Sequence, residues 1–171
     1  MNKNFIDSYN VDLCRKLTDG AFLYDHIPTK KPRDYVIHYE KQEWTLVDIG
    51  GAKRERMHWR FHLLGAHGVI FMIDAADKTK FPDVKVELER LISHEHIKAS
   101  VVYIFLNKKD LTDRQPMNEN DILLNINLSH RTLREYNINY YFVSIMTGEG
   151  LESAFEQLYK GMNDHIERSM K

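Results

Sequence analysis

The hydrophobic residues of this chain follow two periods, one typical of buried strands and one typical of helices. Short continuous apolar runs at residues 68–74, 101–107 and 140–144 have the pattern of strands that are covered on both faces. Residues 34–39 and 43–49 are rich in aromatic and β-branched side chains and are separated by a short polar stretch. These two segments are therefore predicted to form a hairpin.

Helical periods lie between and after these strands. A helix is expected at about residues 54–64, and weaker helical segments are expected between residues 118 and 136. After Pro82 and again after Gly150, apolar residues recur at the spacing of one helix face, namely Val84, Leu88, Leu91 and Ile92, then Leu151, Phe155, Leu158, Met162 and Ile166. Because strands and helices alternate, we predict an α/β fold with a doubly wound, mostly parallel sheet, an antiparallel hairpin strand and helices on both faces.

Length and charge narrow the class of protein. The chain has 171 residues and no repeat, linker or low-complexity stretch, so a single domain is expected over residues 1–171. Lys and Arg number 24 against 25 Asp and Glu, which gives no reason to expect nucleic acid as a partner.

Cysteine usage and the two ends of the chain bear on its location. Cys14 is the single cysteine, which excludes an internal disulfide and predicts a reducing compartment, the cytoplasm. No run approaches the roughly 20 apolar residues of a spanning helix, and the polar start differs from a signal peptide. Asn2 does not fit N-myristoylation, and no prenylatable cysteine ends the chain. We therefore expect membrane association to be peripheral and to depend on partner proteins.

Polar residues end four of the predicted strands, at Asp48, Asp74, Asn107 and Ser144. In open parallel sheets ligands bind beyond the carboxyl ends of the strands, where the loops converge. This edge is therefore the predicted place for a nucleotide.

The sharpest motif is Asn107, Lys108 and Asp110, directly after a predicted buried strand. The Asp110 carboxylate can accept hydrogen bonds from both the ring N–H and the exocyclic amine of guanine, a pair that adenine cannot supply. Asn107 can steady the loop and reach the purine, and the Lys108 stem can cover the ring face. Taken alone, the motif fits an ordinary charged strand-to-helix turn equally well.

The loop that begins with Ser144 and Ile145 follows the last predicted strand and leads into the C-terminal helical segment. A backbone N–H of this loop could meet the carbonyl of the base. A helix start that is capped at Thr147 or Gly148 explains the same residues, and the two interpretations are compatible.

Asp48 and Gly51 stand at the end of the second hairpin strand. A carboxylate there can hold a magnesium ion through water, and a glycine N–H can approach a terminal phosphate because no Cβ intrudes. The alternative is a tight turn at two adjacent glycines.

These motifs, in this order, resemble the Ras-like small GTPases and specifically the Arf/Sar family, over about residues 13–162. The shared stretches are Leu17 to Gly20, Ile27 to Thr29, Asp48 to Gly51, Trp59 to Phe61, Gly68 to Asp74, Asn107 to Asp110 and Thr147 to Leu151. The resemblance implies a Ras-like fold that binds GTP or GDP with Mg²⁺. It assigns Thr29 and Asp48 to the metal and Gly51 to the nucleotide, and it places Asn107, Lys108, Asp110, Ser144 and Ile145 in the guanine pocket.

The phosphate-binding end departs from the family pattern. No GxxxxGK[ST] loop occurs in the sequence, and residues 4–12 fall in its place, with Asn10 for the lysine and Val11 for the hydroxyl residue. Sequence divergence and loss of an N-terminal segment both remain open as explanations. Ala52 stands where the family carries Gln, or His in the Sar branch, to orient water. We therefore assign no catalytic residue and expect weak or absent hydrolysis.

Three hypotheses about function remain. The resemblance implies a GTP/GDP-dependent switch of vesicle-mediated intracellular transport, cytoplasmic or peripheral on ER and Golgi membranes, that binds effector or coat proteins through Ile27 to Thr29 and Ala52 to Leu64. The departures favour a pseudo-GTPase that serves as an interaction module or scaffold. A flavodoxin-like or receiver domain would have the same architecture. The sequence lacks the phosphate loop that a flavodoxin needs and the acidic cluster that a receiver needs.

Overall fold

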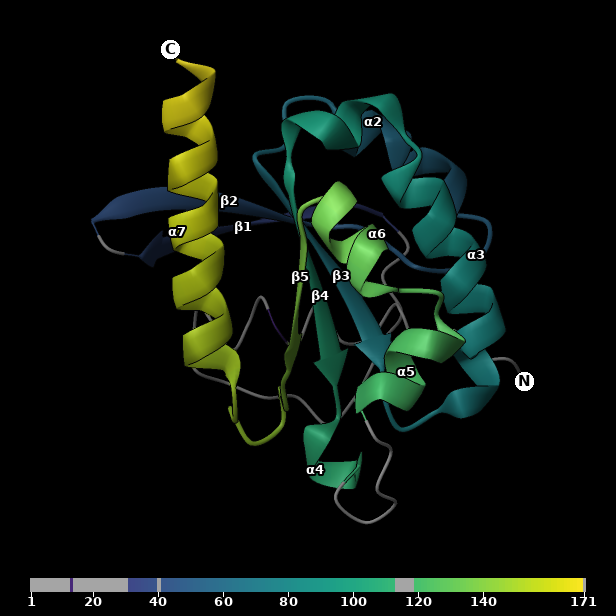
Figure 1. Ribbon diagram of the computed structural model, residues 1–171. Helices are drawn as coiled ribbons and strands as arrows, with labels where there is room; N and C mark the ends of the chain where they lie inside the picture. Colours follow the sequence, from purple (N-terminus) through teal and green to yellow (C-terminus); the bar gives the residue numbers. More distant parts are fainter. Residues whose placement is uncertain (1–12, 14–30, 40, 113–118, 171) are drawn as a thin grey trace. The chain divides into compact units, whose positions relative to one another are not determined.

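A computed structural model of the chain describes residue 13 and residues 31–39, 41–112 and 119–170 (Figure 1). The chain forms two compact units, Met1–His62 and Leu63–Lys171. The single domain expected over residues 1–171 stays a prediction.

The first unit contains the predicted hairpin. Strand β1 (Arg33–Tyr39) pairs antiparallel with β2 (Gln42–Asp48), with Arg33 opposite Asp48. The cross-strand partners Ile37 and Trp44 lie on the better-buried face, as expected for a half-buried antiparallel pair. The hairpin is confirmed, and its second strand ends at Asp48, one residue earlier than predicted.

The segment after β2 differs from the expected helix over residues 54–64. It forms a short 3₁₀ turn, η1 (Arg56–His58), and a single helical turn, α2 (Arg60–Leu63). Arg56 Nε donates to the Gly51 carbonyl at 2.8 Å and Trp59 Nε1 donates to the Gly50 carbonyl at 3.0 Å. These bonds hold the segment to the end of β2, which explains why a long regular helix does not form.

The second unit is built on a three-stranded parallel sheet. Strands β3 (Gly68–Asp74), β4 (Val101–Asn107) and β5 (Ile138–Phe142) lie in the order β3-β4-β5, and every residue of the central strand β4 is buried. This confirms the predicted parallel strands. β5 begins and ends two residues before the predicted 140–144, because Ser144 already turns into the next loop and its N–H bonds the Glu149 carbonyl at 2.9 Å.

Helices cover both faces of this sheet. Figure 1 shows α7 on one side and α3 and α5 on the other, which gives the doubly wound α/β arrangement. The helices are α3 (Phe81–Ile92), α4 (Lys109–Thr112), α5 (Glu119–Asn125), α6 (His130–Glu135) and α7 (Leu151–Ser169), with 3₁₀ turns η2 (Lys78–Lys80) and η3 (Glu95–Ala99). None of the helices in the described residues is long and apolar enough to cross a membrane.

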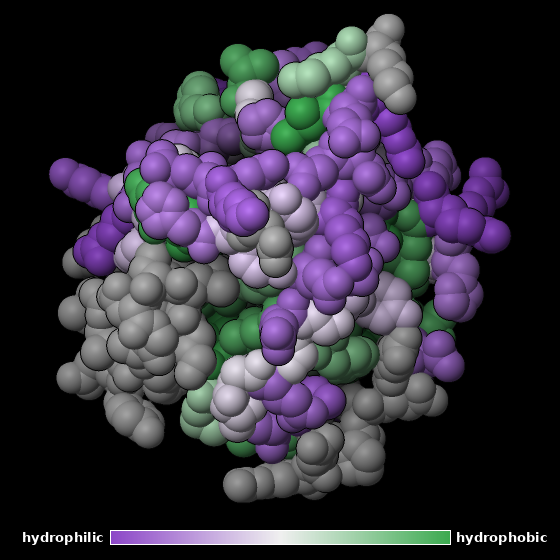
Figure 2. Space-filling view, turned by 90° about the vertical axis from the view of Figure 1, so that its left-hand side faces the viewer, coloured by the Kyte–Doolittle hydropathy of each residue, from purple (hydrophilic) through white to green (hydrophobic). Residues whose placement is uncertain are grey.

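Helix α7 packs closely on β4. The Phe155 ring meets Phe105 edge-on with centroids 5.8 Å apart, and a Cβ at Gly161 would collide with the Tyr103 hydroxyl. That hydroxyl donates to the Gln157 carbonyl at 2.8 Å, and burial raises the pKa of Tyr103 to about 12, so the donor stays protonated. Seen from the α7 side, the surface is mainly hydrophilic (Figure 2). Four residues of the predicted apolar face are therefore core, namely Leu151, Phe155, Leu158 and Met162, whereas Ile166 is half-buried.

Candidate functional site

Asn107 ties the loop after β4 to the loop after β5. It is the last residue of β4 and is 2% exposed, so its side-chain amide needs partners inside the protein. Its Oδ1 accepts a hydrogen bond from the Ile145 N–H at 3.0 Å. The two loops that carry the predicted guanine contacts are thus held together before any ligand binds.

Asp110 and Ser144 form a second link between these loops. The Ser144 hydroxyl donates to Asp110 Oδ1 at 2.6 Å and accepts the Thr147 N–H at 3.2 Å. Ser144 is fully buried, whereas Asp110 is partly exposed. The buried hydroxyl therefore fixes the orientation of a carboxylate that still reaches the surface of the protein.

Lys108 occupies the left-handed region of backbone space, with φ at 70°. Its Nζ lies 2.9 Å from Asp74 Oδ2 at the end of β3. The next residue, Lys109, pairs with Glu149, which lies in the loop after β5. Two consecutive lysines thus join the loop after β4 to both neighbouring strand ends.

Two glycines shape the loop after β5. Gly148 has φ of 85° and Gly150 has φ of 76°, and a Cβ at Gly150 would collide with the Phe142 carbonyl oxygen. Both glycines are needed for the backbone to return from β5 into α7 over such a short path. The Gly148 N–H also bonds the Ser144 carbonyl at 2.8 Å.

The structure therefore brings the predicted guanine-contact residues together at one edge of the parallel sheet, namely Asn107, Lys108, Asp110, Ser144 and Ile145. A carboxylate, an amide and backbone N–H groups at this edge suit a purine that offers two adjacent donors and one carbonyl. Sequence reasoning missed the contribution of Lys109 and Glu149. Their opposite charges were visible, but their contact depends on how two loops distant in sequence fold toward each other.

The predicted phosphate and metal residues belong to the first unit. Asp48 is 2% exposed at the end of β2, and Gly50 and Gly51 follow it. The carboxylate oxygens of Asp48 are hard ligands of the kind that Mg²⁺ prefers. No group of three His, Cys, Asp or Glu side chains within the described ranges could hold a metal ion by itself. Thr29 and residues 4–12 lie outside the described residues.

Ala52 begins the turn that precedes η1. Its carbonyl accepts the Glu55 N–H at 2.7 Å and the Arg56 N–H at 3.2 Å. Its methyl group can neither donate nor accept a hydrogen bond, so this position cannot orient a water molecule.

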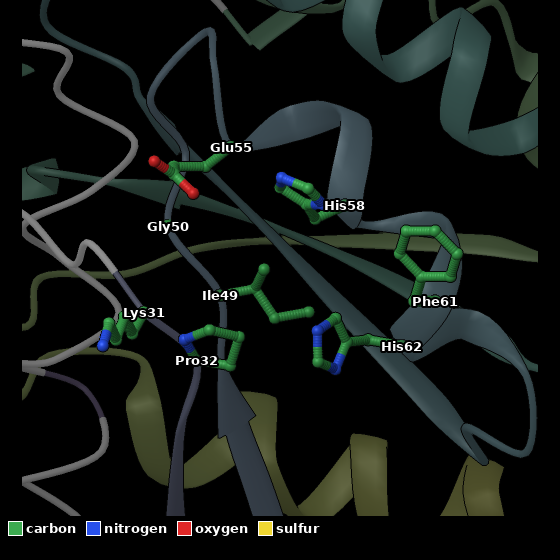
Figure 3. Close-up of a pocket in the computed structure, with 8 residues that line it drawn as sticks. All are labelled: Lys31, Pro32, Ile49, Gly50, Glu55, His58, Phe61 and His62. Carbon is green, nitrogen blue, oxygen red and sulfur yellow. The ribbon is translucent and has the colours of Figure 1, made fainter.

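The first unit also contains a small pocket of about 230 Å³ (Figure 3). Its lining residues are Lys31, Pro32, Ile49, Gly50, Glu55, His58, Phe61 and His62. This volume is below the roughly 300–1,000 Å³ of sites for drug-sized ligands. None of the predicted guanine contacts lines the pocket, and four of its residues fall in the segment predicted to meet partner proteins.

The sequence model of the ADP-ribosylation factor family matches residues 12–162. The chain belongs to the Arf family. This confirms the resemblance found in the sequence and identifies the chain as an Arf-family member of the Ras-like small GTPases, a class whose members bind guanine nucleotides.

Individual relatives agree with this assignment. The chain is 29% identical over 125 residues to "ADP-ribosylation factor-like protein 5" of Dictyostelium discoideum, covering 73% of this chain and 66% of that protein. It is 25% identical over 138 residues to "ADP-ribosylation factor J" of the same organism, covering 81% and 71%. The match thus spans about two thirds of the length of the first relative.

The fold is also that of a solved small GTPase. The Arl6 (BBS3) small GTPase of Trypanosoma brucei, solved with the nucleotide analogue GppNp, matches with a TM-score of 0.78 at 18% identity, over 91% of each chain. This likeness confirms the predicted Ras-like α/β fold of the Arf family member.

Proposed function

We propose that this Arf-family chain is a guanine-nucleotide switch of vesicle-mediated transport that hydrolyses GTP weakly or not at all. The observation that carries the proposal is the pair of bonds that joins Asp110 to Ser144 at 2.6 Å and Asn107 to Ile145 at 3.0 Å. They hold a carboxylate and a backbone loop in place around the position of a purine edge. A preorganised site of this kind binds its ligand without first ordering its own loops.

The base is recognised by the edge that distinguishes guanine from adenine. Asp110 accepts the ring N–H and the exocyclic amine of guanine, and a backbone N–H of the loop that follows β5 donates to the base carbonyl. Adenine offers an acceptor and no donor where Asp110 needs the ring N–H, so its binding would set a carboxylate oxygen against the lone pair of a ring nitrogen. The Lys108 stem covers the ring face.

A second set of proposed contacts concerns Mg²⁺ and the terminal phosphate. Asp48 and Thr29 would hold the metal, and the Gly51 N–H would meet the terminal phosphate of GTP. Loss of that phosphate removes a contact to the segment that starts at Gly51. Through such a contact, a bound nucleotide shifts a switch segment between an ordered and a disordered state.

Effector or coat proteins bind through Ile27 to Thr29 and through Ala52 to Leu64. Within the described residues, Met57 and Phe61 are 65% and 63% exposed, and the guanidinium of Arg60 lies 4.8 Å from the Phe61 ring centre. Exposed apolar side chains beside Arg are typical of protein interfaces. Association with endomembranes is then peripheral and follows from these partners.

Trp59 offers a direct test of switching, because its indole N–H bonds the Gly50 carbonyl beside Gly51. We expect its fluorescence to differ between the chain saturated with GDP and the chain saturated with a non-hydrolysable GTP analogue. The chain has two tryptophans, so the measurement uses Trp44→Phe, which leaves Trp59 as the reporter, and Trp59→Phe as the matched control. Identical Trp59 emission at saturation with both nucleotides would contradict switching.

That contrary result would favour the second candidate, a pseudo-GTPase scaffold. The observation in its favour is the Ala52 methyl group, which cannot orient water. A scaffold keeps the same partner-binding surface in both nucleotide states.

A further inference from the structure

Asp74 stands at the end of β3, opposite Asn107 in the register of the parallel sheet. Its side chain is 6% exposed. A carboxylate removed from water to this extent is stable only if it is paired and hydrogen-bonded. The residues that meet it therefore indicate what it does.

Both oxygens of Asp74 have partners. Oδ1 accepts the Ala76 N–H at 3.0 Å, which closes a turn after β3. Oδ2 meets the ammonium of Lys108 at 2.9 Å, and that lysine side chain is 23% exposed. The first contact is local, whereas the second joins β3 to the loop that follows β4.

The second contact determines the course of the Lys108 side chain. The backbone of Lys108 follows β4, while its Nζ lies at the end of β3, so the aliphatic stem runs from one strand end to the neighbouring one. On the other side of β4, Asp110 is held by Ser144 after β5. Lys108 and Asp110 are thus each held by a residue from a neighbouring strand end.

We infer that Asp74 is a positioning residue of the guanine site, which acts on the base through Lys108 by holding the lysine stem over the ring. The inference rests on the proposed guanine binding. A flexible lysine that must be ordered by the ligand loses side-chain entropy on binding, and an ion pair formed beforehand reduces that loss. Asp74 thereby raises affinity without touching the nucleotide.

The test is a double-mutant cycle on GDP binding to the full chain, measured by calorimetric titration. Asp74→Asn keeps the shape and the acceptor for the Ala76 N–H but removes the charge that holds Lys108. Lys108→Met keeps an apolar stem and removes the ammonium. The effects of mutating two residues in contact depart from additivity by amounts that correspond to a few-fold to about a hundredfold in affinity. We expect Asp74→Asn to weaken GDP binding on the order of tenfold.

In the Lys108→Met background, Asp74→Asn should have no further effect, because the ammonium through which Asp74 acts is gone. Asp77→Asn is the matched control, since Asp77 lies in the same turn and bonds Thr79 instead. Asp74→Glu, which keeps the charge one methylene farther out, should lose less affinity than Asp74→Asn. It also serves if Asp74→Asn does not fold, and thermal unfolding without nucleotide reports on that.

Two results would overturn this inference but not the proposed function. One is GDP affinity of Asp74→Asn equal to that of the wild type. The other is an equal loss of GDP affinity on Asp74→Asn in the wild-type and Lys108→Met backgrounds. The second result would mean that Asp74 supports only the fold. If the wild-type chain does not bind GDP at all, the proposed function fails and this inference fails with it.

Discussion

Asp110→Asn should change the preferred base from guanine to xanthine. The carboxylate accepts two donors from guanine, whereas an amide presents one donor and one acceptor, which matches the carbonyl that xanthine carries in place of the amine. A site built to pair a specific group rejects ligands that leave it unpaired by large factors. We expect the ratio of GDP to XDP affinity to fall on the order of 10³-fold.

The measurement is titration of the wild type and of the variant with GDP and with XDP. Because Asp110 also accepts the Ser144 hydroxyl, thermal unfolding of the free variant must show that the loop survives; an amide oxygen can still accept that bond. Asp121→Asn, an exposed acid on α5, is the matched control and should leave the ratio unchanged. An Asp110→Asn chain that still prefers GDP would show that another group selects the base.

GTP hydrolysis should be far slower than in an ordinary small GTPase. Guanine contacts bind the ground state and the transition state equally, so they hold the nucleotide without accelerating loss of its γ phosphate. The groups that act on the transition state are a phosphate-binding lysine and a water-orienting side chain, and the sequence has Asn10 and Ala52 at those positions. Binding and turnover are therefore expected to separate.

Single-turnover hydrolysis with and without Mg²⁺ measures this directly. An ordinary small GTPase turns over at about 4 × 10⁻⁴ s⁻¹, and we expect a rate lower by a factor of at least ~10. Ala52→Gln restores a water-orienting side chain and should not by itself bring the rate back, because the lysine position stays unfilled. A magnesium-dependent wild-type rate near the ordinary value would contradict the expectation and would point to another cation at the phosphates.

The fold was largely predictable because its signals are local. The apolar runs that became β3 and β4 and the helix period of α7 each lie in one continuous stretch of sequence, and burial of these stretches leaves little choice of structure. The guanine-type loops were predictable for a related reason, since a short motif directly after a buried strand is placed at the sheet edge by the strand itself.

Other features depend on contacts between distant residues, which no local pattern contains. A helix is expected at residues 54–64, but hydrogen bonds from Arg56 and Trp59 to the glycine carbonyls after β2 fix a different backbone there. The ion pair of Lys108 with Asp74 joins residues whose separation along the chain gives no hint of contact. The roles of Thr29 and Asn10 stay predictions.

Selection of guanine over adenine is the central claim, and competition between GDP and ADP for the wild-type chain tests it most directly. A fluorescent GDP analogue is bound to the full chain with Mg²⁺ and displaced by either nucleotide. Because the two ligands carry the same phosphates and ribose, any difference belongs to the base and hence to Asp110 and its loop. The account predicts displacement by GDP at a concentration at least about 100-fold below that needed for ADP. Equal displacement by the two nucleotides would contradict it.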